Sequence, residues 1–127
     1  MDFTELVERA HAMNVYVIAS AIDADGVYCD AAGLIVLNPR LTRSGEVFTL
    51  AHELVHALRC DVCAQSREVE VLVDQAAARM LVDPVAYAAA ERLVGGDVYG
   101  LAEELGVSVE CVVAYRGWLA NHPDNVS

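Results

Sequence analysis

Residues 47–58 read VFTLAHELVHAL, and this stretch carries both a clear helical pattern and the most specific polar motif of the chain. Ser44 is predicted to cap the start of the helix, with Glu46 favourable in the first turn. The apolar residues recur every three or four positions and so form one stripe of an amphipathic helix. These residues are Val47, Leu50, Ala51, Leu54, Val55 and Leu58.

Two histidines and a glutamate lie inside this helix with the spacing of a zinc site. His52 and His56 are four residues apart, so their imidazoles share one face, with Cβ atoms about 5–6 Å apart, and can hold one tetrahedral zinc ion. Glu53 points about 100° around the helix, where it can accept a proton from a water on the metal. The motif predicts Glu53 as the catalytic base. The alternative is a helix whose histidines only pack or face solvent, and the specificity of the motif argues against it.

A catalytic zinc ion needs a third protein ligand, and the residues after the motif offer several carboxylates. They are Asp61, Glu68, Glu70 and Asp74. Glu70 and Asp74 are four residues apart on a second predicted helix, so they share a face. We assign Glu70 as the metal ligand and Asp74 as the acceptor of a ligating histidine's other N–H, which fixes its tautomer. Glu68 stays an alternative ligand, and a solvated acidic face is the competing interpretation.

The remaining segments predict an α+β fold. A helical pattern opens the chain at Phe3, and turns between the next short apolar segments favour antiparallel pairing. The strands are expected at Val15–Ala19, Val27–Asp30 and Leu34–Leu37. The fold class is therefore an N-terminal helix, a small three-stranded antiparallel sheet, and a helical bundle that carries the motif helix.

The bundle is predicted to contain further helices after the motif helix. They run from Ser66 to about Val82, from Pro84 to the break at Gly95-Gly96, over Val98–Leu105, and over Val109–Leu119 with Ser108 as cap. In the first of them an inward stripe is expected, made of Val69, Leu72, Val73, Ala76 and Met80. A length of 127 residues predicts one domain, residues 1–127, with 121–127 as a frayed tail.

Charge argues against nucleic acid as a direct partner. The net charge is −11 and all eight basic residues are arginine, so the surface repels phosphate. The segment LAEELGVSVECVVAYR, residues 101–116, has helix-turn-helix spacing but only Arg116 as a cation. Two packed helices with a tight turn are therefore favoured there. A basic protein is the kind of partner that this charge attracts.

No secretory signal or membrane span is expected. The first ten residues are acidic and amphipathic, and the longest apolar run, residues 15–22, is too short for a bilayer. We therefore expect a cytoplasmic protein with free thiols. Cys60 and Cys63 have metal-ligand spacing, but a second pair is missing because Cys29 and Cys111 are single, so we interpret them as unpaired thiols in a loop.

Residues 14–118 resemble the ImmA/IrrE-type metallopeptidases, a gluzincin-like family with an HExxH motif. The resemblance rests on VFTLAHELVHAL, on Ile35-Val36-Leu37-Asn38 before it, and on EVEVLVDQAAARML after it. Carried over, it implies His52, His56 and Glu70 as zinc ligands and Glu53 as base. Val55 stands where the family often has Gly, and Ala76 where it commonly has an aromatic residue.

The resemblance also implies a function. We expect a zinc-dependent endopeptidase that acts on a protein regulator, such as a DNA-binding repressor or an antitoxin. The alternative is a zinc-containing module that binds such a regulator without cutting it, and the presence of Glu53 argues against this because non-catalytic relatives usually lose the base.

Overall fold

Helix α1 (Phe3–Ala12) leads into the short strands β1 (Tyr16–Ala19), β2 (Gly26–Cys29) and β3 (Leu34–Leu37). Helices follow to the end of the fold: α2 (Arg43–Leu58), α3 (Arg67–Leu81), α4 (Pro84–Val94), α5 (Val98–Leu105) and α6 (Val109–Asn121). These bounds come from a computed structural model that describes residues 1–62 and 64–123. The predicted α+β class is confirmed. Cys63 and residues 124–127 of the expected tail lie outside the described residues.

Side-chain oxygens cap the starts of the helices at short polar residues. Ser66, Asp83 and Ser108 each accept a hydrogen bond from a backbone N–H three residues on, and the cap predicted at Ser108 is confirmed. The predicted cap of α2 at Ser44 is wrong. Thr42 takes this position, because its backbone is extended and its Oγ1 accepts from the N–H of Gly45 at 3.1 Å. The helix therefore starts one residue before Ser44.

The sheet is mixed, which corrects the prediction of a purely antiparallel one. Strand order is β1-β3-β2, with β3 antiparallel to β2 and parallel to β1. The short turn between β2 and β3 gives the antiparallel pair that was expected. The segment between β1 and β2, residues 20–25, instead spans two strand spacings, about 9–10 Å, and leaves room for β3. Strand β2 is thus left at one edge of the sheet.

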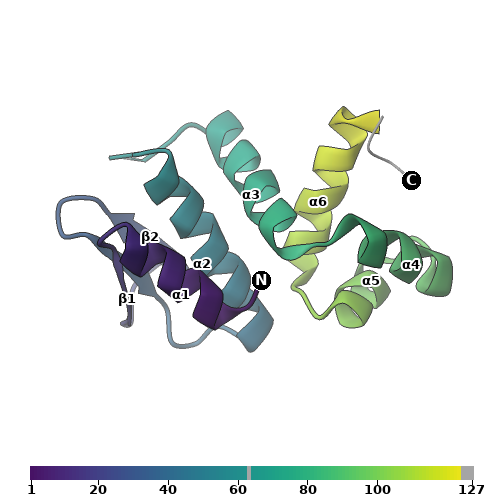
Figure 1. Cartoon of the computed structure of the whole chain (residues 1–127), viewed down its shortest axis with the longest axis horizontal. Coiled ribbons are helices and arrows are strands. Elements are labelled where there is room, and N and C mark those ends of the chain that lie inside the picture. Colours follow the sequence, from purple (N-terminus) through teal and green to yellow (C-terminus); the bar gives the residue numbers. More distant parts are fainter. Residues whose placement is uncertain (63, 124–127) are drawn as a thin grey trace.

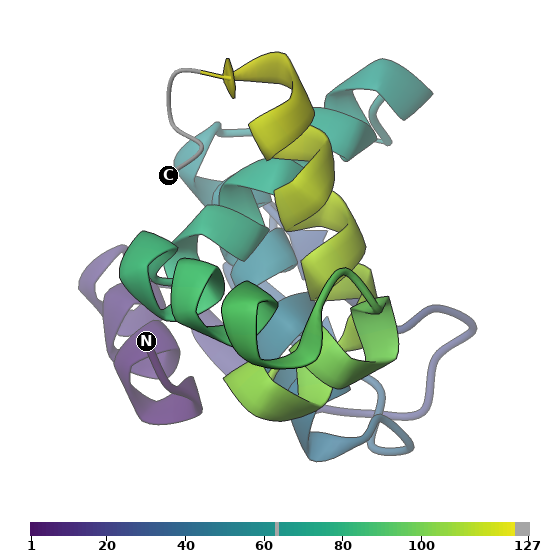
Figure 2. The same cartoon turned by 90° about the vertical axis from the view of Figure 1, so that its right-hand side faces the viewer.

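Helix α2 lies at the centre of the N-terminal half. It contacts α1, β2, β3 and α3, while α3 packs on α6 and the α4–α5 pair lies at the other end (Figure 1). The view from that end shows α4 and α5 in front, with α3 and α6 behind them (Figure 2). Leu50 and Leu54 of α2, together with Ile35 of β3, are fully buried in this arrangement. The motif helix therefore lies between the sheet and the helical bundle.

Two apolar residues expected to face inward are exposed. Leu58, at the last turn of α2, and Leu72, on α3, are each 58% exposed. Helix α3 packs against α2 and α6, so its buried residues are Val73, Gln75, Ala77 and Ala78 rather than a stripe through Leu72. Leu58 is the last residue of α2, and its side chain is open to solvent there.

Close approach of β2 to α2 depends on a glycine. A Cβ at Gly26 would lie 2.5 Å from Cγ2 of Thr49 and 3.4 Å from Cγ of Glu53. Both of these residues belong to the motif helix, and no side chain fits between this helix and the strand edge at residue 26. Gly26 therefore sets the distance between the edge strand and Glu53.

We predict that Gly26→Ala lowers the free energy of unfolding by about 1–3 kcal/mol, because the added methyl group overlaps Thr49. Chemical denaturation measures the change. Gly96→Ala is the matched control, since its Cβ would meet only Nη2 of Arg116 at 3.8 Å. If adding Thr49→Ser to Gly26→Ala restores part of the lost stability, the overlap lies at the methyl group of Thr49. Equal free energies of unfolding for the two alanine variants would contradict the overlap.

Candidate metal centre

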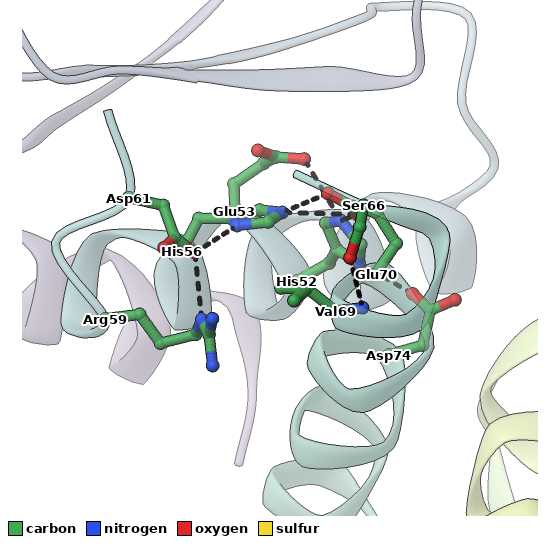
Figure 3. Close-up of polar contacts among 9 residues, drawn as sticks. All are labelled: His52, Glu53, His56, Arg59, Asp61, Ser66, Val69, Glu70 and Asp74. Carbon is green, nitrogen blue, oxygen red and sulfur yellow. Dashed lines mark hydrogen bonds and ion pairs between the residues drawn. The ribbon is translucent and has the colours of Figure 1, made fainter. Parts of the chain in front are cut away.

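Three side chains from α2 and α3 meet at one point. The Glu70 carboxylate lies between the two imidazoles, with Oε2 at 3.0 Å from Nε2 of His52 and Oε1 at 3.0 Å from Nε2 of His56 (Figure 3). One ligand atom from each of these residues lies within 4.8 Å of the others. The two imidazole rings are edge to face, with centroids 4.9 Å apart. These residues form the centre of the candidate site.

Carboxylates hold the opposite nitrogens of both imidazoles. Nδ1 of His52 lies 2.6 Å from Oδ1 of Asp74, and Nδ1 of His56 lies 2.9 Å from Oδ2 of Asp61. A carboxylate accepts, so each ring donates its Nδ1–H, and in the neutral ring the lone pair is then on Nε2. Both Nε2 atoms point toward Glu70 (Figure 3). This is the tautomer that a histidine needs to bind a metal through Nε2.

The end of α2 brings Asp61 back to His56. The N–H of Asp61 donates to the carbonyl of His56 at 3.0 Å, and the N–H of Cys60 donates to that of Ala57 at 3.0 Å. Cys60 has φ +61°. This pattern is a Schellman motif with cysteine where glycine is usual. Arg59 Nε also donates to Asp61 at 2.9 Å, on the same oxygen, Oδ2, that His56 contacts, and so helps to fix this carboxylate.

The first turn of α3 places Glu70. The Oγ of Ser66 accepts from the N–H of Val69 at 3.2 Å, and the N–H of Glu70 donates to the carbonyl of Ser66 at 2.9 Å. The carboxylate of Glu70 therefore starts from a fixed turn at the positive end of the helix. Glu68 lies on the same turn but is exposed and is not among the three residues that meet.

Glu53 is buried beside this centre. Its side chain is 9% exposed, one oxygen lies 3.8 Å from Nε2 of His52, and the carboxylate accepts a hydrogen bond from the backbone N–H of Tyr28 in β2. Burial raises the pKa of Glu53, although the nearby histidines oppose this shift. A carboxylate with a raised pKa is a better proton acceptor, so the environment suits a general base.

The charges around His52 also shift its affinity for a proton. Burial alone would lower the pKa of His52, but the hydrogen bond to Asp74 and the charges of Glu53 and Glu70 outweigh it, so this pKa is raised. The hydrogen bond from His56 holds the pKa of Asp61 below its ordinary value. Protons therefore compete for the lone pair of His52 at higher pH than they do for an ordinary histidine.

The donor set suits zinc. Two imidazole Nε2 atoms and one carboxylate are the ligands of many catalytic zinc sites, which keep a fourth position open. Ligand atoms at about 2.0–2.1 Å in a tetrahedron lie about 3.3 Å apart. The nitrogen–oxygen separations of 3.0 Å here are close to that spacing. Small movements of the side chains would therefore allow the three residues to hold the ion.

Two hollows meet at the centre. One, of about 580 Å³, extends from His52 and Glu53 toward Arg40 and the start of α6, and the other, of about 420 Å³, extends past His56 toward Asp61. Gly26 of the edge strand lines both hollows, as do His52 and Glu53. The candidate site therefore lies in the middle of a cleft that follows β2.

The structure brings together all the residues assigned from the sequence: His52, Glu53, His56, Glu70 and Asp74. Sequence reasoning missed the contact of Asp61 with His56, although Asp61 was one of the four acidic residues considered. The position of Asp61 directly after the motif helix is the sequence signal that could have predicted this contact. The contact of Glu53 with β2 had no sequence signal, because it depends on how close the strand lies.

Comparisons with known proteins find a family and a solved structure that this chain resembles. The model of a peptidase family, described as the IrrE N-terminal-like domain, matches residues 10–116. A solved structure of a Mycobacterium tuberculosis transcriptional regulator is similar in fold, with a TM-score of 0.65 and 19% sequence identity, over 87% of this chain and 39% of that one. The chain thus spans well under half of that regulator. No curated protein matches the chain.

The described residues include no helix that is long and apolar enough to cross a membrane.

We predict that Glu70→Ala weakens zinc binding far more than Glu68→Ala does. Of the two, Glu70 contacts both imidazoles, whereas Glu68, on the same helix turn, is exposed. Competition with a chromophoric chelator measures both affinities. The two variants lose the same charge from the same helix turn, so equal losses would contradict the assignment.

We predict a pH effect for Asp74→Asn. Zinc needs the neutral imidazole, so affinity falls in acid, and for the wild type this fall begins above the pH set by the ordinary histidine pKa of 6.5. Removing the Asp74 charge lowers the pKa of His52, so the fall should begin at lower pH. At neutral pH the affinity should drop about 10–100-fold. Asp23→Asn loses the same charge at an exposed turn and should bind zinc as the wild type does. If the pH at which half of the zinc affinity is lost does not change in Asp74→Asn, Asp74 does not support His52 in the way proposed.

Proposed function

This chain belongs to the family of IrrE N-terminal-like domains, and from that premise we propose that it is a zinc-dependent endopeptidase that acts on a protein regulator. Family membership supports the resemblance to ImmA/IrrE-type metallopeptidases seen in the sequence. The observation that carries the proposal is the contact of Glu70 with both imidazoles beside the buried Glu53. The proposed ligands and the proposed base therefore lie together in one cleft.

His52, His56 and Glu70 would hold the zinc ion. Zinc in such a site supplies Lewis acidity, which polarises a carbonyl and makes a water more acidic. Asp74 and Asp61 keep both rings in the ligating tautomer through hydrogen bonds of 2.6 and 2.9 Å. The protein's own contribution to metal binding is therefore a fixed set of lone pairs, which reduces the ordering needed when the ion arrives.

Glu53 would act as the base and then as the acid. Its carboxylate takes a proton from the attacking water and passes it to the nitrogen of the leaving amine. The N–H of Tyr28 and the closeness of Gly26 hold this side chain against β2, so it does not turn away from the cleft. The raised pKa of Glu53 brings its proton affinity nearer to that of the groups it must serve.

A peptide can enter the cleft along β2. This strand is at the edge of the sheet, and Val27 is 43% exposed. An edge strand binds an extended segment through backbone hydrogen bonds, and the side chains on either side then decide sequence preference. The hollows on both sides of Glu53 give room for residues before and after the cut bond. The arrangement suits an extended protein segment.

Charge favours a basic substrate. The chain carries −11, and the acidic residues that line the larger hollow are Asp25, Glu53, Asp74 and Glu110, against one arginine, Arg40. Attraction of this kind raises the rate of encounter with basic proteins and weakens as salt is added. DNA-binding repressors are basic, and the similar solved structure belongs to a transcriptional regulator. We therefore propose a repressor-like or antitoxin-like protein as the substrate.

We predict that the zinc-loaded protein cuts a repressor-like protein encoded near its gene, and that Glu53→Gln reduces this cleavage about 10²–10⁴-fold with zinc content unchanged. Electrophoresis with mass spectrometry of the products follows the reaction. Glu103→Gln, an exposed residue on α5, is the matched control and should cut at the wild-type rate.

Two outcomes would contradict the proposal. Tight binding of the repressor-like protein at full zinc occupancy, without any cut, would favour a binding module. Rapid cleavage of unfolded casein at the rate of the repressor would contradict a dedicated regulator as substrate.

A further inference from the structure

A third hollow, of about 430 Å³, lies between α3 and α6, which run side by side in Figure 1. Its lining is mostly apolar and includes Val71, Val109, Val113 and Ala114. Two of these side chains are large and open to solvent, since Val71 is 47% exposed and Val113 is 55% exposed. We call this hollow the α3–α6 groove. It is an apolar surface that α3 and α6 leave uncovered.

The groove is joined to the metal cleft. Asp74 and Glu110 line both the groove and the larger hollow that contains His52 and Glu53. Helix α3 also connects them covalently, because Val71 follows Glu70. A chain that leaves the cleft at Asp74 therefore enters the groove directly, at a fixed distance from the candidate metal centre.

The charges of the groove are all of one sign. Asp74 and Glu110 are the charged residues of its lining, and no cation lines it within the described part of the chain. An occupant that places apolar side chains against Val113 and an arginine or lysine near Glu110 would match both features. A second copy of this chain matches poorly, because each copy carries −11 and would bring its own acidic surface to an acidic rim.

We propose that the α3–α6 groove binds an apolar and basic segment of the substrate protein while another part of the same substrate occupies the cleft. This inference rests on the proposed function. The groove would supply affinity that a short peptide in the cleft lacks, and so restrict cleavage to proteins that carry such a segment. Because it lies on α3, the groove would also fix how far the segment is from the cut bond.

Binding of synthetic peptides tests the groove without any need for catalysis. The probes are fluorescein-labelled 12-residue peptides that carry two leucines and two arginines at spacings of two, three or four residues. Anisotropy is measured with the zinc-loaded Glu53→Gln protein, in which the proposed cleavage is slowed. Val113→Arg in this background places a cation in the groove, and Val85→Arg is the matched control, because Val85 is 75% exposed on α4 and gives the same change in net charge.

We expect at least one peptide of the set to bind saturably, with affinity at least about tenfold weaker for Val113→Arg and within about twofold of the parent for Val85→Arg. Replacing the leucines by serine, or the arginines by glutamate, should weaken binding as well. Thermal unfolding of both arginine variants should stay at the parent temperature, because each substituted side chain is exposed.

Three results would overturn the inference: no saturable binding by any peptide, equal affinity of the two arginine variants, or a parent dimer that Val113→Arg makes monomeric in sedimentation. The last would assign the groove to a second copy. Absence of cleavage of every repressor-like protein by the wild type would instead contradict the proposed function and would leave the peptide result standing.

Discussion

The register between α2 and α3 is the constraint on which the rest of the structure depends. The carboxylate of Glu70 reaches both imidazoles at 3.0 Å, and a shift of α3 by one residue would turn it about 100° away. Ser66 fixes the start of α3, and α6 packs on this helix from the side away from α2. The helical bundle is thus what holds the third candidate ligand in place, while the sheet holds Glu53 through β2.

The same residues bring several negative charges close together. Glu53, Asp61, Glu70 and Asp74 surround two imidazoles, and like charges at these distances repel one another. Burial raises the pKa of Glu53, with the charge of Glu70 adding to this shift, and the hydrogen bond to Asp74 together with the nearby carboxylates raises the pKa of His52. A divalent cation at the centre would relieve the repulsion, so metal binding and the stability of this part of the fold should be coupled. The cleft and the α3–α6 groove, both acidic, extend this field outward toward a basic partner.

Sequence patterns predicted the helices, the strands and the meeting of five polar side chains, because the spacing of His52, Glu53 and His56 and of Glu70 and Asp74 is a local property of a helix. These patterns did not predict the features that tertiary packing determines. The parallel pairing of β1 with β3 follows from how a connection crosses the sheet, and the exposure of Leu72 follows from α3 having a neighbour on two sides. The role of Asp61 needs the reversal at Cys60, which a cysteine does not signal as glycine would.

X-ray absorption at the zinc edge, on protein loaded with one equivalent of zinc, tests the central claim most directly. The account predicts two imidazole nitrogens at about 2.0–2.1 Å, with the remaining ligands oxygen at about 2.0–2.2 Å. Glu70→Ala should remove one of these oxygens and leave the imidazole scattering unchanged. Sulfur scattering at about 2.3 Å, from cysteines such as Cys60, or fewer than two imidazoles would contradict the account.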